Sequence, residues 1–511
     1  MTAASTATTN PARAPRLLRL LAATPLWIAL VVTALITAAR LTGTVDTDVA
    51  WQLWIAGRMH AGANLYRDII EVNPPLWFWM AVPVDSIATL LHLRIETVLI
   101  ITMGALVAVS LAATDRLIDQ ISPRRRALLL TYAALILAAM MHVGQREQIV
   151  LIATLPYIAL VAARLEGKPV SPLIAALIGV GAALGFALKH YFLIVPAALE
   201  LWLLTGQGRH WRPLRPETAA IASVGFAYAL AIMLFEPDFL TTIVPLNRLA
   251  YGVLGAPGVR YMFGPMALAG FVPLAFAATH YRMLTKAPFT AALVVAGFGF
   301  AAVYFIQFKG WTYHAVPLLG CGSLALAALL AEIETPSPWL RMIASGLLIL
   351  PFAASVDEAA HPQFPNPDVL GAVAGLRPGD AVGFLTTETA IPWSVTLQGQ
   401  YRYVSRYTSF WMIRAITLNE QAGNPDPRLV ELGRRIVAET AADFACIPPK
   451  RIIVNRPRPG EDTFDMLPFF LRDPNFAAVL SHYKVRSRTS LETYELASAP
   501  PPPAGPCRNG V

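Results

Sequence analysis

The sequence has little charge and little cysteine, and each shortage excludes a class of protein. Asp, Glu, Lys and Arg make up 14% of the 511 residues, whereas a soluble globular domain contains about a quarter. Three cysteines are too few for a disulfide framework, although Cys446 and Cys507 could pair if the C-terminal region lies outside the cytoplasm. A soluble globular protein and a disulfide-rich secreted domain are therefore both excluded.

Apolar residues are what the chain has in abundance. They account for 56% of the sequence, and the mean hydropathy is +0.53, so the membrane is the solvent of this protein. The formal net charge is +8, but Lys and Arg lie in short loops between apolar runs, where they set topology. We therefore do not expect nucleic acid as a partner.

Eleven stretches are expected to cross the bilayer. The first, 20–39, follows three N-terminal arginines, exceeds a signal-peptide core and lacks a convincing cleavage site. The others lie at 95–114, 127–142, 148–164, 172–188, 191–205, 218–235, 264–280, 288–307, 314–332 and 339–356. A further apolar run, 74–93, holds Pro83 and Asp85 near its middle. Since a central Asp costs roughly 2.5–3.5 kcal/mol in a membrane, we expect an interfacial or re-entrant helix there.

The basic residues after Arg94 support this topology. With 74–93 not crossing, the loops expected in the cytoplasm hold Arg116, Arg124, Arg125, Arg126, Arg164, Lys168, Arg209, Arg212, Arg215, Arg282, Lys286 and Arg341. The outer loops hold only Arg146, Lys189, Arg248, Arg260 and Lys309. By the positive-inside rule, the N-terminus is cytoplasmic and the C-terminus lies outside, in the periplasm of a bacterial inner-membrane, multi-pass protein.

The predicted fold is therefore a polytopic α-helical membrane module with a small α/β domain attached. The module covers 1–356, and its first outer loop, 42–94, carries surface helices. From residue 357 the apolar runs shorten, and 357–499 is expected to form the periplasmic domain. Within it, 381–386, 401–406, 451–454 and 491–496 resemble strands and 428–442 a helix. The Pro-rich tail 500–511 is expected to be disordered.

The first outer loop is the most informative segment, and it reads DTDVAWQLWIAGRMHAGANLYRDIIEVNPPLWFW over 46–79. Trp51, Trp54, Ile55 and Met59 share one helical face, which predicts a short amphipathic helix along the membrane surface.

Two carboxylates precede this helix. Asp48 can be interpreted as a helix N-cap, or as a general base at the membrane surface, with Asp46 beside it.

Other expected outer loops contribute polar side chains to the same face of the membrane. They are Gln145, Arg146 and Glu147; Lys189, His190 and Tyr191; Arg248; and the segment QFKGWTYH at 307–314. Each alone has an ordinary explanation, because Lys and Arg snorkel and Trp and Tyr populate the interface. Together they are typical of a site for an anionic lipid headgroup, with cations for phosphate and a carboxylate to accept a proton.

These motifs resemble those of the GT-C class of membrane glycosyltransferases, in the bacterial branch related to dolichyl-phosphate-mannose protein mannosyltransferases and the lipid A aminoarabinose transferase. In that class an acidic motif opens the first outer loop and a Pro-Pro-Leu-aromatic element follows, as Asp46/Asp48 and the segment NPPLW at 73–77 do here. The segment GAALGFALKHYFLIVP resembles the family's Gly-rich span ending in a Lys-aromatic pair. The resemblance covers roughly 20–330. One departure is that Thr47 separates two acids that are often adjacent, which leaves the choice of base open; we favour Asp48.

The resemblance implies a polyprenyl-phosphate-linked monosaccharide donor, an extracytoplasmic glycan, lipid or protein acceptor, and transfer with inversion. Some relatives use a divalent metal near the acidic motif, but no tight ligand spacing is visible here, and we expect no cofactor. The candidate catalytic residues are Asp48 and Asp46, and the candidate phosphate ligands are Lys189, Arg248, Lys309, His314 and Arg146. The candidate lining of the lipid and sugar groove is Trp51, Tyr66, Glu71, Asn73, Pro74, Pro75, Trp77, His190, Tyr191, Trp311 and Tyr313, with Trp54 and Trp79 as further tryptophans.

Other functions remain open at this stage. An O-antigen-ligase-like or polymerase-like enzyme also uses lipid-linked sugars, but it depends on outer-loop Arg and His rather than on an acidic first loop. A secondary transporter would place charges at mid-membrane and show internal repeats, and we find no repeat. A non-catalytic scaffold would use the outer domain for binding.

Overall fold

The computed structural model describes residues 26–139, 142–254, 258–360, 365–456, 465–502 and 507. Residues 20–25 of the first predicted span lie outside the described residues. So do 503–506 and 508–511 of the tail that the sequence predicts to be disordered.

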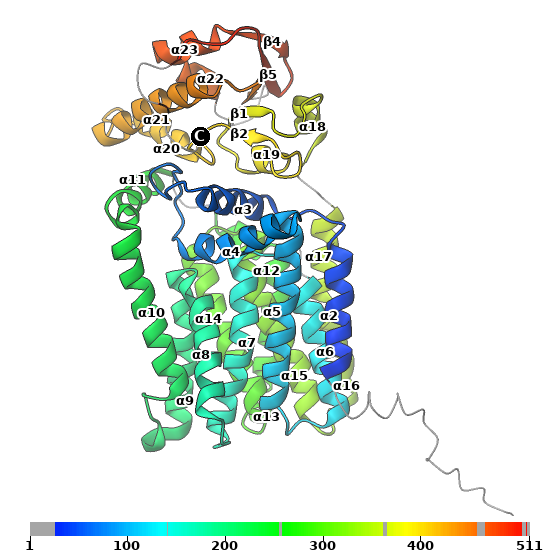
Figure 1. Ribbon diagram of the computed structural model, residues 1–511. Coiled ribbons are helices and arrows are strands. Elements are labelled where there is room, and N and C mark those ends of the chain that lie inside the picture. The colour runs from blue at the N-terminus through cyan, green and yellow to red at the C-terminus, as the bar shows by residue number, and fades with distance from the viewer. Residues whose placement is uncertain are drawn as a thin grey trace, which may run out of the picture.

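A bundle of long helices makes up the N-terminal two thirds of the protein (Figure 1). Its long helices are α2 (Leu26–Arg40), α5 (Ile95–Leu117), α6 (Pro123–Ala139), α7 (Arg146–Leu165), α8 (Pro172–Ala187), α9 (Ile194–Gln207), α10 (Pro216–Phe235), α12 (Pro265–Thr279), α14 (Pro288–Gln307), α15 (Val316–Glu332), α16 (Pro338–Leu347) and α17 (Leu350–Ala360). Shorter elements are η1 (His190–Leu193), η2 (Gly208–His210), the π-helical η3 (Phe239–Ile243), η4 (Val259–Phe263), α13 (Tyr281–Leu284) and η5 (Thr312–Ala315).

Each predicted span coincides with a helical segment. By length and composition alone, seven segments of the described chain can cross a membrane, and shorter apolar helices stand at most of the other predicted positions. The last predicted span is two helices, α16 and α17. The prediction of a polytopic α-helical membrane fold is therefore confirmed.

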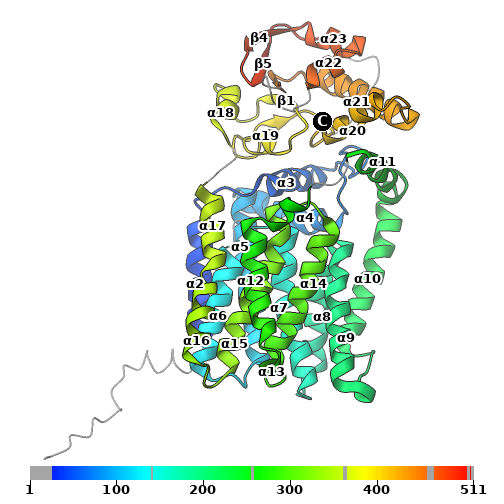
Figure 2. The ribbon, with the colours of Figure 1, turned by 180° about the vertical axis from the view of Figure 1, so that it is seen from behind.

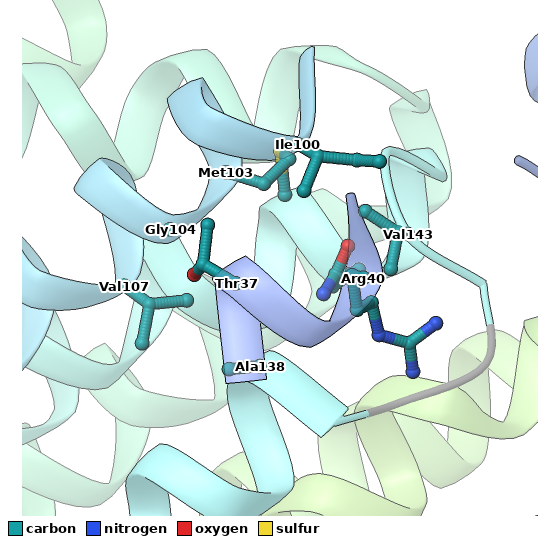
Figure 3. Close-up of a pocket in the computed structure, with 9 residues that line it drawn as sticks. Thr37, Arg40, Ile100, Met103, Gly104, Val107, Ala138 and Val143 are labelled. Atoms are coloured by element: carbon teal, nitrogen blue, oxygen red, sulfur yellow. The ribbon is translucent and has the colours of Figure 1, made fainter. Parts of the chain in front are cut away.

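Gly104 of α5 packs against the Thr37 side chain of α2 near the start of the bundle. A Cβ atom at Gly104 would lie 2.4 Å from Oγ1 of Thr37, so a larger residue there would force the Thr37 side chain to move. A small pocket beside the contact is lined mostly by apolar side chains, with Thr37, Arg40 and Gln148 as its polar members (Figure 3). Its mainly apolar lining indicates helix packing rather than a polar site.

Two helices of the first loop form a layer between the bundle and the C-terminal domain (Figures 1 and 2). They are α3 (Thr47–His60) and α4 (Leu76–Leu91). Oδ2 of Asp85 on α4 lies 2.7 Å from Nδ1 of His60 at the end of α3. This pairing gives the central Asp of the run 74–93 a partner. That the run does not cross the bilayer stays a prediction.

The C-terminal domain is a mixed sheet with helices. Its strands are β1 (Ala381–Leu385), β2 (Arg402–Tyr403), β3 (Arg451–Asn455), β4 (Tyr483–Ser487) and β5 (Leu491–Leu496), in the order β2-β1-β3-β5-β4. Its helices are α18 (Pro367–Val373), α19 (Ala390–Trp393), α20 (Trp411–Gln421), α21 (Pro427–Cys446), α22 (Met466–Phe470) and α23 (Pro474–Leu480). The strands β1, β2 and β3 are parallel, while β5 is antiparallel to both of its neighbours. A disulfide joins Cys446 to Cys507. The predicted small α/β domain is confirmed.

Aromatic contacts hold this domain against the bundle. The ring of Trp54 on α3 lies 5.1 Å from that of Trp393 and 5.4 Å from that of Tyr403. On the other side of the interface, Tyr251 of α11 (Val244–Leu254) stacks on Trp411 at 4.6 Å. Trp54 therefore anchors the C-terminal domain.

A buried ion pair supports the same interface. The Arg406 guanidinium donates two hydrogen bonds to Asp443, at 2.6 and 3.1 Å, and the carbonyl of Arg406 accepts from the backbone N–H of Ile70 in the first loop. Both side chains of the pair are almost fully buried. Removing one partner of such a pair leaves an uncompensated buried charge.

We expect Arg406→Met to destabilise the C-terminal domain by about 3–5 kcal/mol. Arg434→Met is the matched control, because its ion pair with Glu431 is exposed and contributes about 0.5 kcal/mol or less. Thermal unfolding of the full-length protein in lipid nanodiscs measures both. Equal melting temperatures for the two variants would contradict the structural role of Arg406.

Candidate active site

Polar side chains from separate segments meet at the end of the bundle that faces the C-terminal domain. They come from the start of α3, the loop before α4, the start of α7, the α8–η1 junction and the α14–η5 loop. Several of them are buried although they are charged. Buried charges cost free energy unless they are paired or serve a ligand, so this cluster is the candidate site.

Asp46 has a structural role at the start of α3. It is the N-cap of α3, and its Oδ1 accepts the backbone N–H of Asp48 at 2.8 Å. Its Oδ2 lies 2.8 Å from Nδ1 of His142. Burial raises its pKa, but the bonds from His142, Asp48 and Gln145 outweigh burial and hold the pKa below the usual value. The interpretation of Asp48 as the helix cap was therefore wrong, because Asp46 fills that role.

Asp48 lies in the first turn of α3 and does not cap it. Burial and the neighbouring charge of Asp46 raise its pKa to about 6, against the opposing effects of Arg146, Tyr313 and Gln145. A carboxylate with a pKa near 6 is better matched to accepting a proton at neutral pH than an ordinary Asp. Of the two acids, Asp48 has the properties of a general base.

Arg146 lies at the centre of the cluster. It begins α7, is 5% exposed, and donates from Nη1 to the Asn73 side-chain oxygen at 2.6 Å. Asn73 in turn donates to Glu71 at 2.7 Å, and Glu71 also accepts the backbone N–H groups of residues 72 and 73. Burial raises the pKa of Glu71. This chain of bonds fixes the guanidinium, while its Nε has no partner in the protein.

Lys189 lies just before η1 and interacts electrostatically with Arg146. Its ammonium contacts Oε1 of Glu147, Oε1 of Gln307 at 3.0 Å and Nε2 of His314 at 3.1 Å. Burial lowers the pKa of Lys189 to about 8, and the Glu147 carboxylate opposes this effect. Asp48 also acts on Lys189 electrostatically. The structure therefore brings the acid of the first loop close to a cation from a later loop.

The remaining predicted cations lie further out. The Lys309 ammonium is 4.4 Å from the ring centroid of Tyr251, and burial lowers the pKa of Lys309. Arg248 is exposed on α11 and has no contact with the cluster among the described residues. Lys309 thus borders the site, whereas the structure does not bring Arg248 into it.

The residues expected to line a groove divide into inner and outer sets. Among the inner ones, the Trp77 indole donates to the Gly144 carbonyl at 2.9 Å, and the Tyr66 hydroxyl donates to the Asn73 carbonyl at 2.6 Å. Trp51 and Pro75 are also buried, and the Trp51 indole N–H has no partner. Tyr313, Tyr191 and Pro74 are partly buried, while Trp311 and His190 are exposed. Trp79 lies near Glu236 and Tyr228.

Sequence reasoning missed three residues of the site. His142 falls at the end of a predicted span, Glu147 follows Arg146 with no predicted role, and Gln307 begins the segment at 307–314. A His at a predicted span end, two residues before a glycine, is the available signal for His142. Their partners, Asp46 and Lys189, are distant in the chain, so spacing alone does not reveal them.

The donor set does not fit a tightly held metal ion. Among the described residues no three His, Cys, Asp or Glu side chains are placed to share one. Asp46 is already engaged by a backbone N–H and by His142.

Solved structures of another protein share the architecture of this chain. No protein-family model matches the chain, and no curated protein sequence matches it. The crystal structure of ArnT from Cupriavidus metallidurans bound to undecaprenyl phosphate superimposes with a TM-score of 0.57 at 13% identity, over 96% of this chain and 100% of that one. This chain has the ArnT fold. The apo structure of the same ArnT gives a TM-score of 0.51 at 14% identity, covering 92% and 99% of the two chains. The resemblance predicted from the sequence is thus confirmed at the level of the fold, over nearly the whole chain.

Proposed function

We propose that this chain is an inverting glycosyltransferase that moves a monosaccharide from a polyprenyl-phosphate donor to an acceptor outside the cytoplasm. One observation carries the proposal: Asp48, with its pKa raised to about 6, lies within electrostatic reach of Arg146 and Lys189. The ArnT structure with the same fold holds undecaprenyl phosphate, which supports a lipid-linked donor. The acceptor is an envelope glycan, lipid or protein.

In the proposed reaction Asp48 removes the proton from the acceptor hydroxyl. The acceptor oxygen forms a bond to the anomeric carbon as the bond from that carbon to the phosphate oxygen breaks on the opposite face. The electron pair of the broken bond leaves with the polyprenyl phosphate. Arg146, Lys189 and Lys309 supply the positive charge that stabilises this leaving group, so the site needs no general acid. We propose that no metal takes part, and transfer in the presence of EDTA tests this.

We expect a strain lacking this protein to lose one sugar from its envelope. Mass spectrometry of lipopolysaccharide, exopolysaccharide and glycoproteins from the deletion strain would identify the missing monosaccharide and its acceptor. Complementation with the intact gene should restore the sugar. Unchanged glycans in all three fractions would contradict the transferase proposal and favour a scaffold.

We also propose that the site and the C-terminal domain face the periplasm, with the N-terminus in the cytoplasm. The basic loops of the sequence support this orientation, as does the Cys446–Cys507 disulfide in the C-terminal domain.

An engineered thiol tests the orientation. Ser481 in the C-terminal domain and Thr285, after α13 at the opposite end of the bundle, are both exposed. In intact spheroplasts we expect a membrane-impermeant maleimide to label Ser481→Cys and to label Thr285→Cys only after permeabilisation. The native cysteines give little background, because Cys321 is buried and the other two are paired. The reverse labelling pattern would invert the topology.

A further inference from the structure

The Lys189 ammonium has no hydrogen left for a substrate. An ammonium carries three N–H donors and no acceptor, and three acceptors already surround it: Oε1 of Glu147, Oε1 of Gln307 and Nε2 of His314. With a pKa of about 8, Lys189 is mostly protonated at neutral pH. Its contribution to binding a phosphate is therefore charge, without a direct hydrogen bond.

This arrangement determines the protonation of His314. Since the Lys189 ammonium can only donate, Nε2 of His314 has to accept and cannot carry a proton. A neutral imidazole with a bare Nε2 carries its proton on Nδ1. His314 is 5% exposed, and its Nδ1 has no hydrogen-bond partner in the protein. The Nδ1–H group is thus a buried donor without an acceptor.

A second unused donor lies in the same cluster. Nε of Arg146 is buried and has no partner, although Nη1 of the same guanidinium is held by Asn73. Leaving a buried donor unpaired costs about 1–3 kcal/mol, and more for a charged group. The cluster also holds the unpaired indole N–H of Trp51 and two buried acceptors without partners, Oε1 of Gln145 and Oε2 of Glu147. The charged and imidazole donors of Arg146 and His314 indicate a place for an oxygen-rich anion.

We propose that Glu147 and Lys189 are positioning residues that hold His314 in its Nδ1–H form, so that His314 and Arg146 donate to the phosphate of the lipid-linked substrate. Glu147 anchors the ammonium, the ammonium occupies Nε2 of His314, and Nδ1–H is left for the ligand. This inference deepens the proposed function and rests on it for the identity of the anion. Under this inference Lys189 is not the direct phosphate ligand that the sequence predicted, but a residue that acts through His314.

Histidine-labelled protein tests the tautomer directly. We expect the ¹⁵N spectrum of the full-length protein in lipid bilayers to show His314 as a neutral Nδ1–H imidazole, with His314→Asn identifying its signal among the nine histidines. In Lys189→Met this signal should move toward the Nε2–H form, because nothing then donates to Nε2. In the control variant Lys309→Met the His314 signal should keep its position. An Nε2–H or doubly protonated His314 in the unmodified protein would overturn the proposal.

Two substitutions of His314 test the donor itself. The amide of Asn places an N–H near the position of Nδ1, whereas the longer Gln places it near Nε2. We expect His314→Gln to bind undecaprenyl phosphate about tenfold more weakly than His314→Asn, since a hydrogen bond to a charged group contributes roughly this factor. Equal affinities, or the opposite order, would refute the role of Nδ1. If the unmodified protein binds no undecaprenyl phosphate, the proposed function fails, while the spectrum still decides the tautomer.

Discussion

Replacing Asp48 with Asn is expected to reduce sugar transfer about 10²–10⁴-fold, the usual contribution of a general base. The amide keeps the size of the side chain and cannot take a proton from the acceptor hydroxyl. Asp48 does not cap α3, so the fold should persist and the protein should reach the membrane at its normal level. The measurement is incorporation of the missing sugar in a deletion strain complemented with the variant, together with an immunoblot of the membranes.

Asp46→Asn is the matched control for that variant. Asn is as good an N-cap as Asp, so α3 should keep its start, and transfer should be retained to a much greater extent than in Asp48→Asn. The pH profile gives a second check. Transfer by the unmodified protein should fall as the pH drops through about 6, because Asp48 becomes protonated. Asp46→Asn removes the negative charge that raises this pKa, so the fall should move to lower pH. Loss of activity only in Asp46→Asn would make Asp46 the base.

Replacing Arg146 with Gln is expected to reduce transfer about 10²–10³-fold, as loss of one buried donor to a developing anion does in other enzymes. The variant loses the charge that acts on Asp48 and the donor to Asn73. Binding of undecaprenyl phosphate should weaken as well, because Arg146 contributes both charge and an unused N–H. Transfer in complemented cells and lipid binding by the purified variant measure the two effects separately.

Arg248→Gln is the control for the loss of a cation. Arg248 was expected from the sequence to bind phosphate, but it is exposed on α11, where a single charge is screened by water and salt. We expect less than about a twofold change in transfer, since exposed charges contribute little. A large loss in Arg248→Gln with little loss in Arg146→Gln would reverse the roles assigned from the structure.

The sequence was sufficient for the membrane module because hydrophobic length is a local property. Each span could be recognised from its own residues, and Pro83 with Asp85 marked an apolar run that is not expected to cross. The strands at 381–386 and 451–454 were found for the same reason. β4, with a mostly exposed pattern, was missed because its place in the sheet comes from pairing with β5.

The candidate site depended more on tertiary contacts. Loop position and residue type were enough to select Asp48, Arg146, Lys189 and His314 from the sequence. They could not distinguish Asp46 from Asp48, because that distinction depends on which carboxylate caps α3 and meets His142. Nor could they separate Arg146 from Arg248, since burial follows from how α7 and α11 pack.

By itself, therefore, the sequence determined the solvent of this protein, the positions of its spans and the face on which its polar loops are expected to gather. These follow from the free energy of moving side chains between water and lipid, which each segment carries independently. Only the tertiary structure decided which charges are buried together and which hydrogen bonds are already taken. Those depend on pairs of residues such as Lys189 and Glu147, which are far apart in the chain and adjacent in space.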